Sequence, residues 1–90
     1  MECMYYVYIL KSKKVDKLYI GYTTDLKQRF ISHNQGRNRA TKAYAPFTLV
    51  YYEAYGASKD ARKRELQLKQ FKQSYTRLKE RIAESIRGQN

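Results

Sequence analysis

The sequence predicts an α+β fold in a single domain over residues 1–90. Three short runs rich in β-branched and aromatic residues predict strands, and three capped stretches with apolar residues at helical spacing predict helices. A chain of this length buries only about 60% of the surface that it exposes when unfolded, so one core is expected and a second domain is not.

The predicted strands cover residues 4–10, 18–22 and 48–55. The polar connection between the first two has the length of a hairpin loop, so these strands are expected to be antiparallel neighbours. A register symmetric about that loop places Tyr8 opposite Tyr19. Both tyrosine side chains are then expected on the same face of the sheet.

The first predicted helix begins at Asp25 and ends at Gln35, where a glycine follows. Asp25 is a capping residue, and Gln28 stands three positions after it, as in a capping box. His33 continues the apolar stripe of this helix and Arg29 lies on its flank. Both polar side chains are therefore expected to point toward the sheet rather than to open water.

An irregular, basic surface loop is predicted for residues 37–46, and two helices follow the third strand. One is expected from Ser58 to about Lys72, and the other from Ser74 or Tyr75 to about Gly88. The last helix carries a packing stripe at helical spacing: Tyr75, Leu78, Ile82 and Ile86.

The helix that starts at Ser58 places one carboxylate on its inward face. Its buried stripe is expected to run through Ala61, Glu65, Leu68 and Lys72. A buried glutamate needs a partner, and two readings stay open. Glu65 either holds a metal ion with the help of a bound substrate or forms a structural salt bridge with Arg62, Lys69 or Arg29.

The charge of the chain points to a polyanionic partner. Nineteen Lys and Arg against eight Asp and Glu leave a formal net charge of +11, which favours nucleic acid, with contact to structural RNA as the plainest reading. A membrane partner is not expected, because no stretch reads as an apolar span or a signal peptide. With one cysteine and one histidine, neither an internal disulfide nor an all-protein zinc site is expected, and a reducing cytoplasm fits.

The acidic residues are scattered along the chain, which argues against a two-metal nuclease. One divalent cation, Mg²⁺ above all, remains compatible with the sequence. Magnesium commonly keeps several waters and takes one or two carboxylates together with a substrate phosphate. Glu65 alone could hold such an ion only when nucleic acid is bound, and the salt bridge stays the alternative.

The order of several short motifs resembles the GIY-YIG endonuclease family over residues 4 to about 73. The motifs are Val7-Tyr8-Ile9-Leu10, Tyr19-Ile20-Gly21, Asp25-Leu26-Lys27-Gln28-Arg29, His33-Asn34 and Arg64-Glu65. The chain is most similar to small single-domain bacterial members related to the catalytic modules of excision-repair and Holliday-junction nucleases. The resemblance implies a three-stranded antiparallel sheet packed with about three to four helices, and a metal-dependent endonuclease that acts on DNA, with a place in DNA repair.

The resemblance also implies a role for each site residue. Glu65 corresponds to the metal-binding glutamate, and Arg29 to the arginine that contacts the scissile phosphate. Tyr8 and Tyr19 are the motif tyrosines, one of which accepts a proton from the attacking water, and His33 assists proton transfer or positioning. The chemistry suits these residues, because a cation and the fork of an arginine stabilise the charge that builds on phosphate oxygens. A tyrosine, with an ordinary pKa of about 10, needs such neighbours to act as a base.

Nucleic acid is expected to contact a further group of residues through its backbone and shape rather than through a long sequence. Gly21 lets the substrate backbone approach beside Tyr19. The other predicted contacts are basic side chains of the loop and of the second predicted helix: Arg37, Arg39, Lys42, Arg62 and Lys69. A protein partner is an open expectation for targeting.

Two positions depart from the family pattern. Tyr6 stands where the family name has glycine, two residues before the functional Tyr8. Many members carry an asparagine in the helix after the glutamate, whereas this chain reads Ser74-Tyr75-Thr76-Arg77 there. The alternative functions are therefore a nucleic-acid-binding module with a weak or inactive nuclease site and a basic scaffold for an acidic partner.

Overall fold

Three antiparallel strands form one sheet in the order β2-β1-β3, so β1 is the central strand. The structure is a computed structural model, and it describes residues 3–88. The elements in chain order are β1 (Tyr5–Ser12), β2 (Leu18–Thr23), α1 (Leu26–Asn34), a 3-10 turn η1 (Lys42–Tyr44), β3 (Phe47–Tyr55), α2 (Ser58–Gln70), α3 (Lys72–Arg81) and α4 (Ala83–Arg87). The predicted α+β fold with a three-stranded antiparallel sheet is confirmed.

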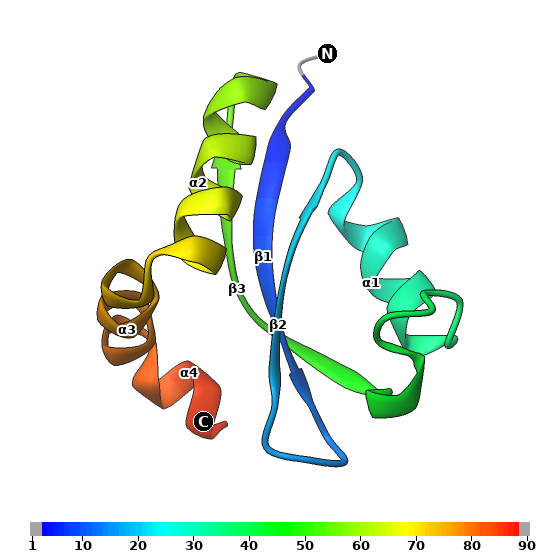
Figure 1. The fold of residues 1–90 in the computed structure, drawn as a ribbon. Coiled ribbons are helices and arrows are strands. Elements are labelled where there is room, and N and C mark those ends of the chain that lie inside the picture. Colours follow the sequence, from blue (N-terminus) through cyan, green and yellow to red (C-terminus); the bar gives the residue numbers. More distant parts are fainter. Residues whose placement is uncertain (1–2, 89–90) are drawn as a thin grey trace.

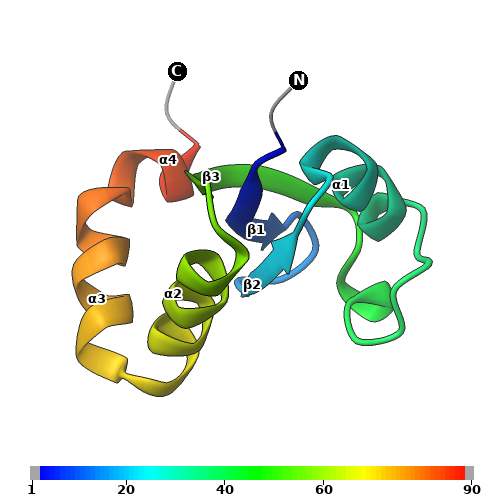
Figure 2. The ribbon, with the colours of Figure 1, turned by 90° about the horizontal axis from the view of Figure 1, so that it is seen from above.

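Helices cover both faces of the sheet, with α1 on one face and α2, α3 and α4 on the other (Figures 1 and 2). Because successive side chains of a strand point to opposite faces, β1 supplies both cores. Val7 and Ile9 pack toward α2 and α3, with Ala61, Leu68, Leu78 and Ile82. Tyr8 and Leu10 pack on the α1 face, where Phe47 completes the second buried cluster.

The hairpin of β1 and β2 is longer than predicted, and this changes its register. Tyr8 lies opposite Gly21, and Tyr19 lies opposite Leu10, so the predicted pairing of Tyr8 with Tyr19 is wrong. β1 continues to Ser12, whose side-chain oxygen accepts hydrogen bonds from the N–H groups of the turn that follows. The register error is two residues, and an even shift keeps both tyrosines on the predicted common face.

The start of α1 follows its capping residues. The Asp25 carboxylate accepts a hydrogen bond from the Gln28 N–H at 3.1 Å, and this satisfies a backbone donor that has no partner within the helix. At the other end of α1, the Asn34 side-chain amide bonds both backbone polar groups of Phe47. Its Nδ2 donates to the Phe47 carbonyl, and its Oδ1 accepts from the Phe47 N–H at 2.6 Å. These contacts fix α1 between the end of β2 and the start of β3.

A half-buried ion pair joins α2 to the sheet. Arg64 donates through Nε and a terminal nitrogen to the Glu53 carboxylate on β3, at 3.0 and 3.1 Å. The hydroxyls of Tyr51 and Tyr55 donate to the same carboxylate. Burial by itself raises the pKa of Glu53, but Arg64 and the two phenols outweigh it and hold the pKa below its usual value. With Arg64 fixed toward β3, its neighbour Glu65 lies on another flank of α2.

Two predictions about the C-terminal helices are wrong. The single helix expected after Ser74 is broken at Ile82, whose φ of −109° and ψ of 26° are not helical, and the bend lets Ile86 pack against the core beside β3. Lys72 does not lie on the inward stripe of α2, because α2 ends at Gln70 and Lys72 begins α3 as an exposed residue.

Candidate active site

A chain of three buried polar side chains crosses the α1 face of the sheet. The Tyr8 hydroxyl lies 2.9 Å from Nε2 of His33, and Nδ1 of His33 lies 2.7 Å from Oγ1 of Thr41. All three residues are at most 1% exposed. Either neutral tautomer of the imidazole satisfies both bonds, because each hydroxyl can donate or accept. The histidine thus joins a strand, a helix and the loop before η1.

Both members of the Tyr8–His33 pair are held in their neutral forms. Burial, followed by the nearby charge of Arg29, lowers the pKa of His33 below its ordinary value. Burial also raises the pKa of Tyr8 to about 12; Tyr19 and Glu65 act in the same direction, while Arg29 opposes them. The charges of Arg29 and Glu65, from helices on opposite faces of the sheet, therefore both act on the Tyr8 phenol.

Tyr19 completes an aromatic cluster with Tyr8 and His33. Its ring centre lies 6.5 Å from that of Tyr8 and 5.2 Å from that of His33, edge to face with the imidazole. Tyr19 is half-buried, whereas Tyr8 is 1% exposed. Of the two motif tyrosines, Tyr19 is the more accessible to a molecule in solution.

Gly21 is buried directly beneath the Tyr8 ring. A β-carbon at this position would lie 2.3 Å from both Cζ and the hydroxyl oxygen of Tyr8, far closer than side-chain atoms pack. The glycine thus makes room for Tyr8 within the protein. Its predicted contact with a substrate backbone is not tested by this packing and stays a prediction.

Arg29 reaches toward the sheet, as expected, because its guanidinium acts on the Tyr8 hydroxyl through charge and hydrogen bonding. The expectation that it is shielded from water is wrong, because the residue is exposed. It lines a polar hollow of about 210 Å³ together with residues of α1, of the end of β2 and of the turn between them: Thr23, Thr24, Asp25, Gln28 and Ser32. Its charge still acts on Tyr8 and His33. An exposed guanidinium beside a polar hollow is suited to a phosphate oxygen.

Glu65 has one of the salt-bridge partners that the sequence left open. Oε2 of Glu65 lies 2.9 Å from Nζ of Lys69, one turn further along α2, and the two side chains are 21% and 46% exposed. Of the two alternatives for Glu65, the structure therefore shows the salt bridge, with Lys69 as the partner. Metal binding by Glu65 stays a prediction. Its carboxylate still faces the site closely enough to act on Tyr8.

The donor set around Glu65 fits one loosely held hard cation at most. Within residues 3–88, no group of three or more His, Cys, Asp or Glu side chains is gathered for a metal ion. One half-buried carboxylate, paired with a flexible lysine, can take Mg²⁺ when waters and substrate phosphates supply the remaining oxygens. Glu65 is the residue of the site that would hold the ion.

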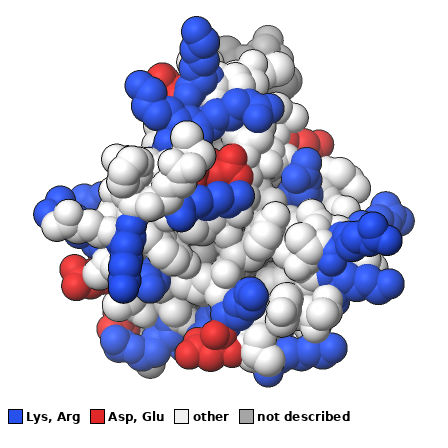
Figure 3. Space-filling model, viewed as in Figure 1, with Lys and Arg blue, Asp and Glu red and all other residues white. Residues whose placement is uncertain are grey.

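The basic side chains predicted to contact nucleic acid are exposed, and their role stays a prediction. Arg37, Arg39 and Lys42 are exposed between α1 and β3, and none of them forms a salt bridge within the described residues. Arg62 stands over the Tyr22 ring at 4.3 Å, while Lys69 is paired with Glu65. Lys and Arg side chains spread over the face seen in Figure 3, with Asp and Glu side chains interspersed among them.

Thr41 is the site residue that sequence reasoning missed. It is buried and holds the second imidazole nitrogen of His33. A threonine in a basic, irregular segment carries no spacing signal, so only the folded path of the loop identifies it.

Comparison with known proteins gives matches over most of the chain. A family model described as the GIY-YIG catalytic domain matches residues 4–80. UPF0213 protein SH2523 of Staphylococcus haemolyticus is 41% identical over 68 residues, which cover 74% of this chain and 82% of that protein. UPF0213 protein SERP0126 of Staphylococcus epidermidis is 40% identical over 74 residues, covering 81% and 84%.

One solved structure is also similar. The solution NMR structure of UPF0213 protein BH0048 from Bacillus halodurans matches with a TM-score of 0.51 and 33% sequence identity, over 84% of this chain and 85% of that one. None of the helices in residues 3–88 has the length and apolar character needed to cross a membrane.

Proposed function

The chain belongs to the GIY-YIG family of nuclease domains, and from this premise we propose that it is a metal-dependent endonuclease that hydrolyses phosphodiester bonds in DNA. One observation carries the proposal: Tyr8, Tyr19 and His33 form one cluster, with the Tyr8 hydroxyl 2.9 Å from Nε2 of His33. The charges of Arg29 and Glu65 both act on the Tyr8 phenol of this cluster. A cation-binding carboxylate and an arginine on either side of one hydroxyl suit phosphoryl chemistry.

Arg29 is the residue assigned to the scissile phosphate. Its guanidinium is exposed in a polar hollow, so a phosphate can reach it without rearrangement of the core. Its charge persists at every physiological pH, and its planar fork can hold two phosphate oxygens as negative charge develops on them.

Tyr19 is the tyrosine assigned to accept the proton of the attacking water. Tyr8 suits this role less, because burial raises its pKa to about 12 and its hydroxyl already contacts His33. Tyr19 is half-buried and packs against both Tyr8 and His33. Tyr8 and neutral His33 then act as positioning residues that hold the ring of Tyr19.

Glu65 is assigned to a divalent cation, Mg²⁺ in the first place. When bound there, the ion supplies positive charge for the nonbridging and leaving oxygens. Lys69 forms a salt bridge with the Glu65 carboxylate, so Lys69 and the ion compete for the same carboxylate. Once displaced, Lys69 is free to contact the nucleic-acid backbone, as the sequence predicts.

The remaining assignments follow from the family and the charge of +11. We assign a branched or otherwise structured DNA substrate, products with a 5′-phosphate and a 3′-hydroxyl, a cytoplasmic location, and a role in DNA repair in which a protein partner supplies targeting. Arg37, Arg39, Lys42 and Arg62 are assigned to the DNA backbone, because they are exposed and basic.

A nucleic-acid-binding module without efficient cleavage is the second candidate. Two observations favour it: Lys69 neutralises Glu65, and the region after α2 carries Ser74 and Thr76 rather than the asparagine of many family members. This candidate predicts salt-sensitive binding without metal-dependent turnover.

Cleavage of a substrate panel separates the two candidates. Purified protein is incubated with single-stranded, nicked and branched DNA, and with RNA of the same sequences, in magnesium or in chelator. The nuclease proposal predicts DNA cleavage in magnesium that Glu65→Gln abolishes and that the control Glu80→Gln, at an exposed position of α3, retains. Binding without cleavage in every arm would leave the binding module.

A further inference from the structure

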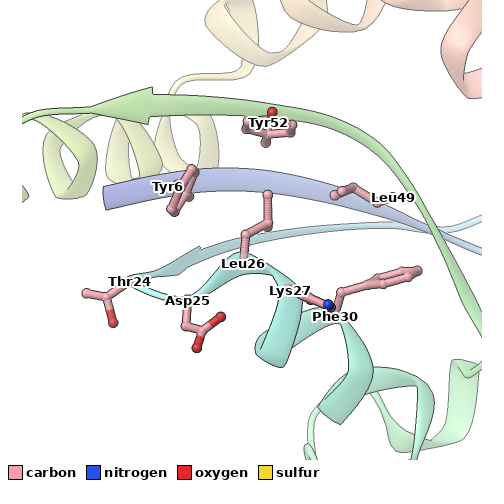
Figure 4. Close-up of a pocket in the computed structure, with 8 residues that line it drawn as sticks. All are labelled: Tyr6, Thr24, Asp25, Leu26, Lys27, Phe30, Leu49 and Tyr52. Carbon is pink, nitrogen blue, oxygen red and sulfur yellow. The ribbon is translucent and has the colours of Figure 1, made fainter. Parts of the chain in front are cut away.

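A second hollow, distinct from the one beside Arg29, lies between α1 and the outer part of the sheet (Figure 4). Its volume of about 510 Å³ falls within the range of roughly 300–1,000 Å³ that small-molecule sites occupy. Apolar and aromatic side chains line most of it: Tyr6, Leu26, Phe30, Leu49 and Tyr52. Thr24, Asp25 and Lys27 complete the lining.

Tyr52 is the unusual member of this lining. It lies on β3, an edge strand, and its side chain is 52% exposed. Its ring meets that of Tyr6 edge to face, with centres 5.8 Å apart, and its hydroxyl forms no hydrogen bond within the described residues. Tyr6 and Tyr52 thus form a continuous aromatic wall of the hollow that a ligand can reach from solvent.

The hollow adjoins the candidate active site. Tyr52 lies opposite Tyr8 in the sheet register, and Tyr6 stands two residues before Tyr8 on the same face. Thr24 and Asp25 line both this hollow and the one that contains Arg29. A strand whose phosphate lies at Arg29 can therefore continue around the N-terminus of α1 into the aromatic hollow.

We propose that the hollow between α1 and β3 binds an unpaired nucleobase of the substrate strand, stacked on the rings of Tyr52 and Tyr6. Aromatic side chains on a sheet face bind bases of single strands in this way, because every base offers a flat π surface. A base that enters the hollow must be unstacked, so the preferred substrate has an unpaired nucleotide next to the cut, as in a flap, a bulge or a single strand. This inference rests on the proposed function.

The polar rim favours a nucleotide over an apolar peptide or a neutral small molecule. Lys27 is exposed and forms no salt bridge within residues 3–88, so its charge is available to a phosphate of the bound nucleotide. The one carboxylate of the lining, Asp25, caps α1 and points away from the aromatic rings in Figure 4. A positively charged rim over aromatic walls matches a base with its phosphate.

The test is binding of labelled oligonucleotides to the full chain in chelator, where cleavage does not interfere. The oligonucleotides are one single strand, the same strand in a perfect duplex, and the same strand with abasic positions. Tyr52→Ala is expected to weaken binding of the single strand about tenfold and to leave the duplex unchanged. Tyr52→Phe, which keeps the ring, is expected to bind as the wild type does, and Lys27→Gln to weaken binding of both DNA forms.

A 2-aminopurine base in the single strand gives an independent readout. Stacking on the protein is expected to quench its fluorescence in the wild type and in Tyr52→Phe, but not in Tyr52→Ala. Circular dichroism checks that Tyr52→Ala stays folded, as expected for a half-exposed side chain. Equal affinity for the abasic and the intact strand, or equal losses for single strand and duplex in Tyr52→Ala, would overturn the proposal.

The result is distinguishable from failure of the proposed function. If the protein cleaves DNA but Tyr52→Ala keeps its preference among strands, the nucleobase site is refuted and the nuclease stands. If Tyr52 is needed for binding unpaired bases but no substrate is cleaved in magnesium, the nuclease is refuted and the nucleobase site stands.

Discussion

Tyr8 rests on Gly21 so closely that a β-carbon at residue 21 would come within 2.3 Å of the Tyr8 hydroxyl oxygen. The two residues are paired across β1 and β2. The glycine of β2 thus determines where the phenol of β1 can lie, and the phenol in turn contacts His33. The YIG motif is therefore a packing requirement as well as a sequence signature.

Substitution of Gly21 by alanine is expected to displace Tyr8. The added methyl group overpacks a buried contact, so the free energy of unfolding should fall by about 1–3 kcal/mol. Chemical denaturation measures this change. Gly56→Ala is the matched control, because nothing lies within 4 Å of its β-carbon position, and it should leave stability unchanged or raise it by about 0.4–1 kcal/mol. Equal effects of the two substitutions would contradict the packing argument.

His33 is expected to make the stability depend on pH. Burial lowers its pKa below the ordinary 6.5, so the unfolded chain binds a proton more readily than the folded one. The contribution of neutral His33 to the free energy of unfolding is fully present above pH 6.5. As the pH falls below 6.5 the free energy of unfolding decreases, by at most about 1.4 kcal/mol per pH unit. Since His33 is the only histidine, the free energy of unfolding of His33→Gln should depend less on pH between pH 7 and pH 5.5 than that of the wild type. An equal dependence on pH in the wild type and in His33→Gln would refute the assignment.

Thr41 is expected to stabilise the site through its hydroxyl alone. Thr41→Val keeps the shape of the side chain but leaves Nδ1 of His33 without its partner, which should lower the free energy of unfolding by about 1–3 kcal/mol. Thr48→Val, at an exposed position of β3, is the control and should change it little. Denaturant titrations of the two variants side by side distinguish a buried hydrogen bond from a general effect of valine.

Lys69 is expected to raise the magnesium requirement. Its salt bridge with Glu65 is partly exposed and of the i,i+4 type, so Lys69→Gln should change stability by no more than about 0.5 kcal/mol. With the carboxylate freed, the magnesium concentration for half-maximal cleavage should fall. Lys63→Gln on the same helix, at an exposed position, should leave that concentration unchanged, and an equal shift in both variants would point to bulk charge instead.

Much of the fold follows from local sequence signals. The residue composition of the strands and the Asp25 cap predicted the bounds of β1, β2, β3 and α1 to within about two residues. These signals are reliable because they act over short distances along the chain. The hairpin register was wrong because the turn begins after Ser12, whose hydroxyl organises it. The bend at Ile82 was missed because packing against β3, rather than a glycine or proline, accompanies it.

The candidate site was partly predictable for the same reason. Tyr8 and His33 were identified from motif order and helical spacing, and the structure joins them by a hydrogen bond. Thr41 was not, because its contact with His33 depends on the path of an irregular loop. Arg29 acts on Tyr8 as its side of the helix predicts, but it is exposed to solvent, since periodicity gives the side of a helix and not the depth to which a long side chain is buried.

Single-turnover cleavage of branched DNA by Arg29→Ala, Glu65→Gln and the double variant tests most directly whether these residues form one catalytic site. Each single substitution is expected to lower the rate by at least about 100-fold, while Arg77→Ala, at an exposed position of α3, should not. Because residues that act as a unit have non-additive effects, the double variant should be little slower than the slower single variant. A wild-type rate in either single variant, or no magnesium-dependent cleavage by the wild type, would contradict the account.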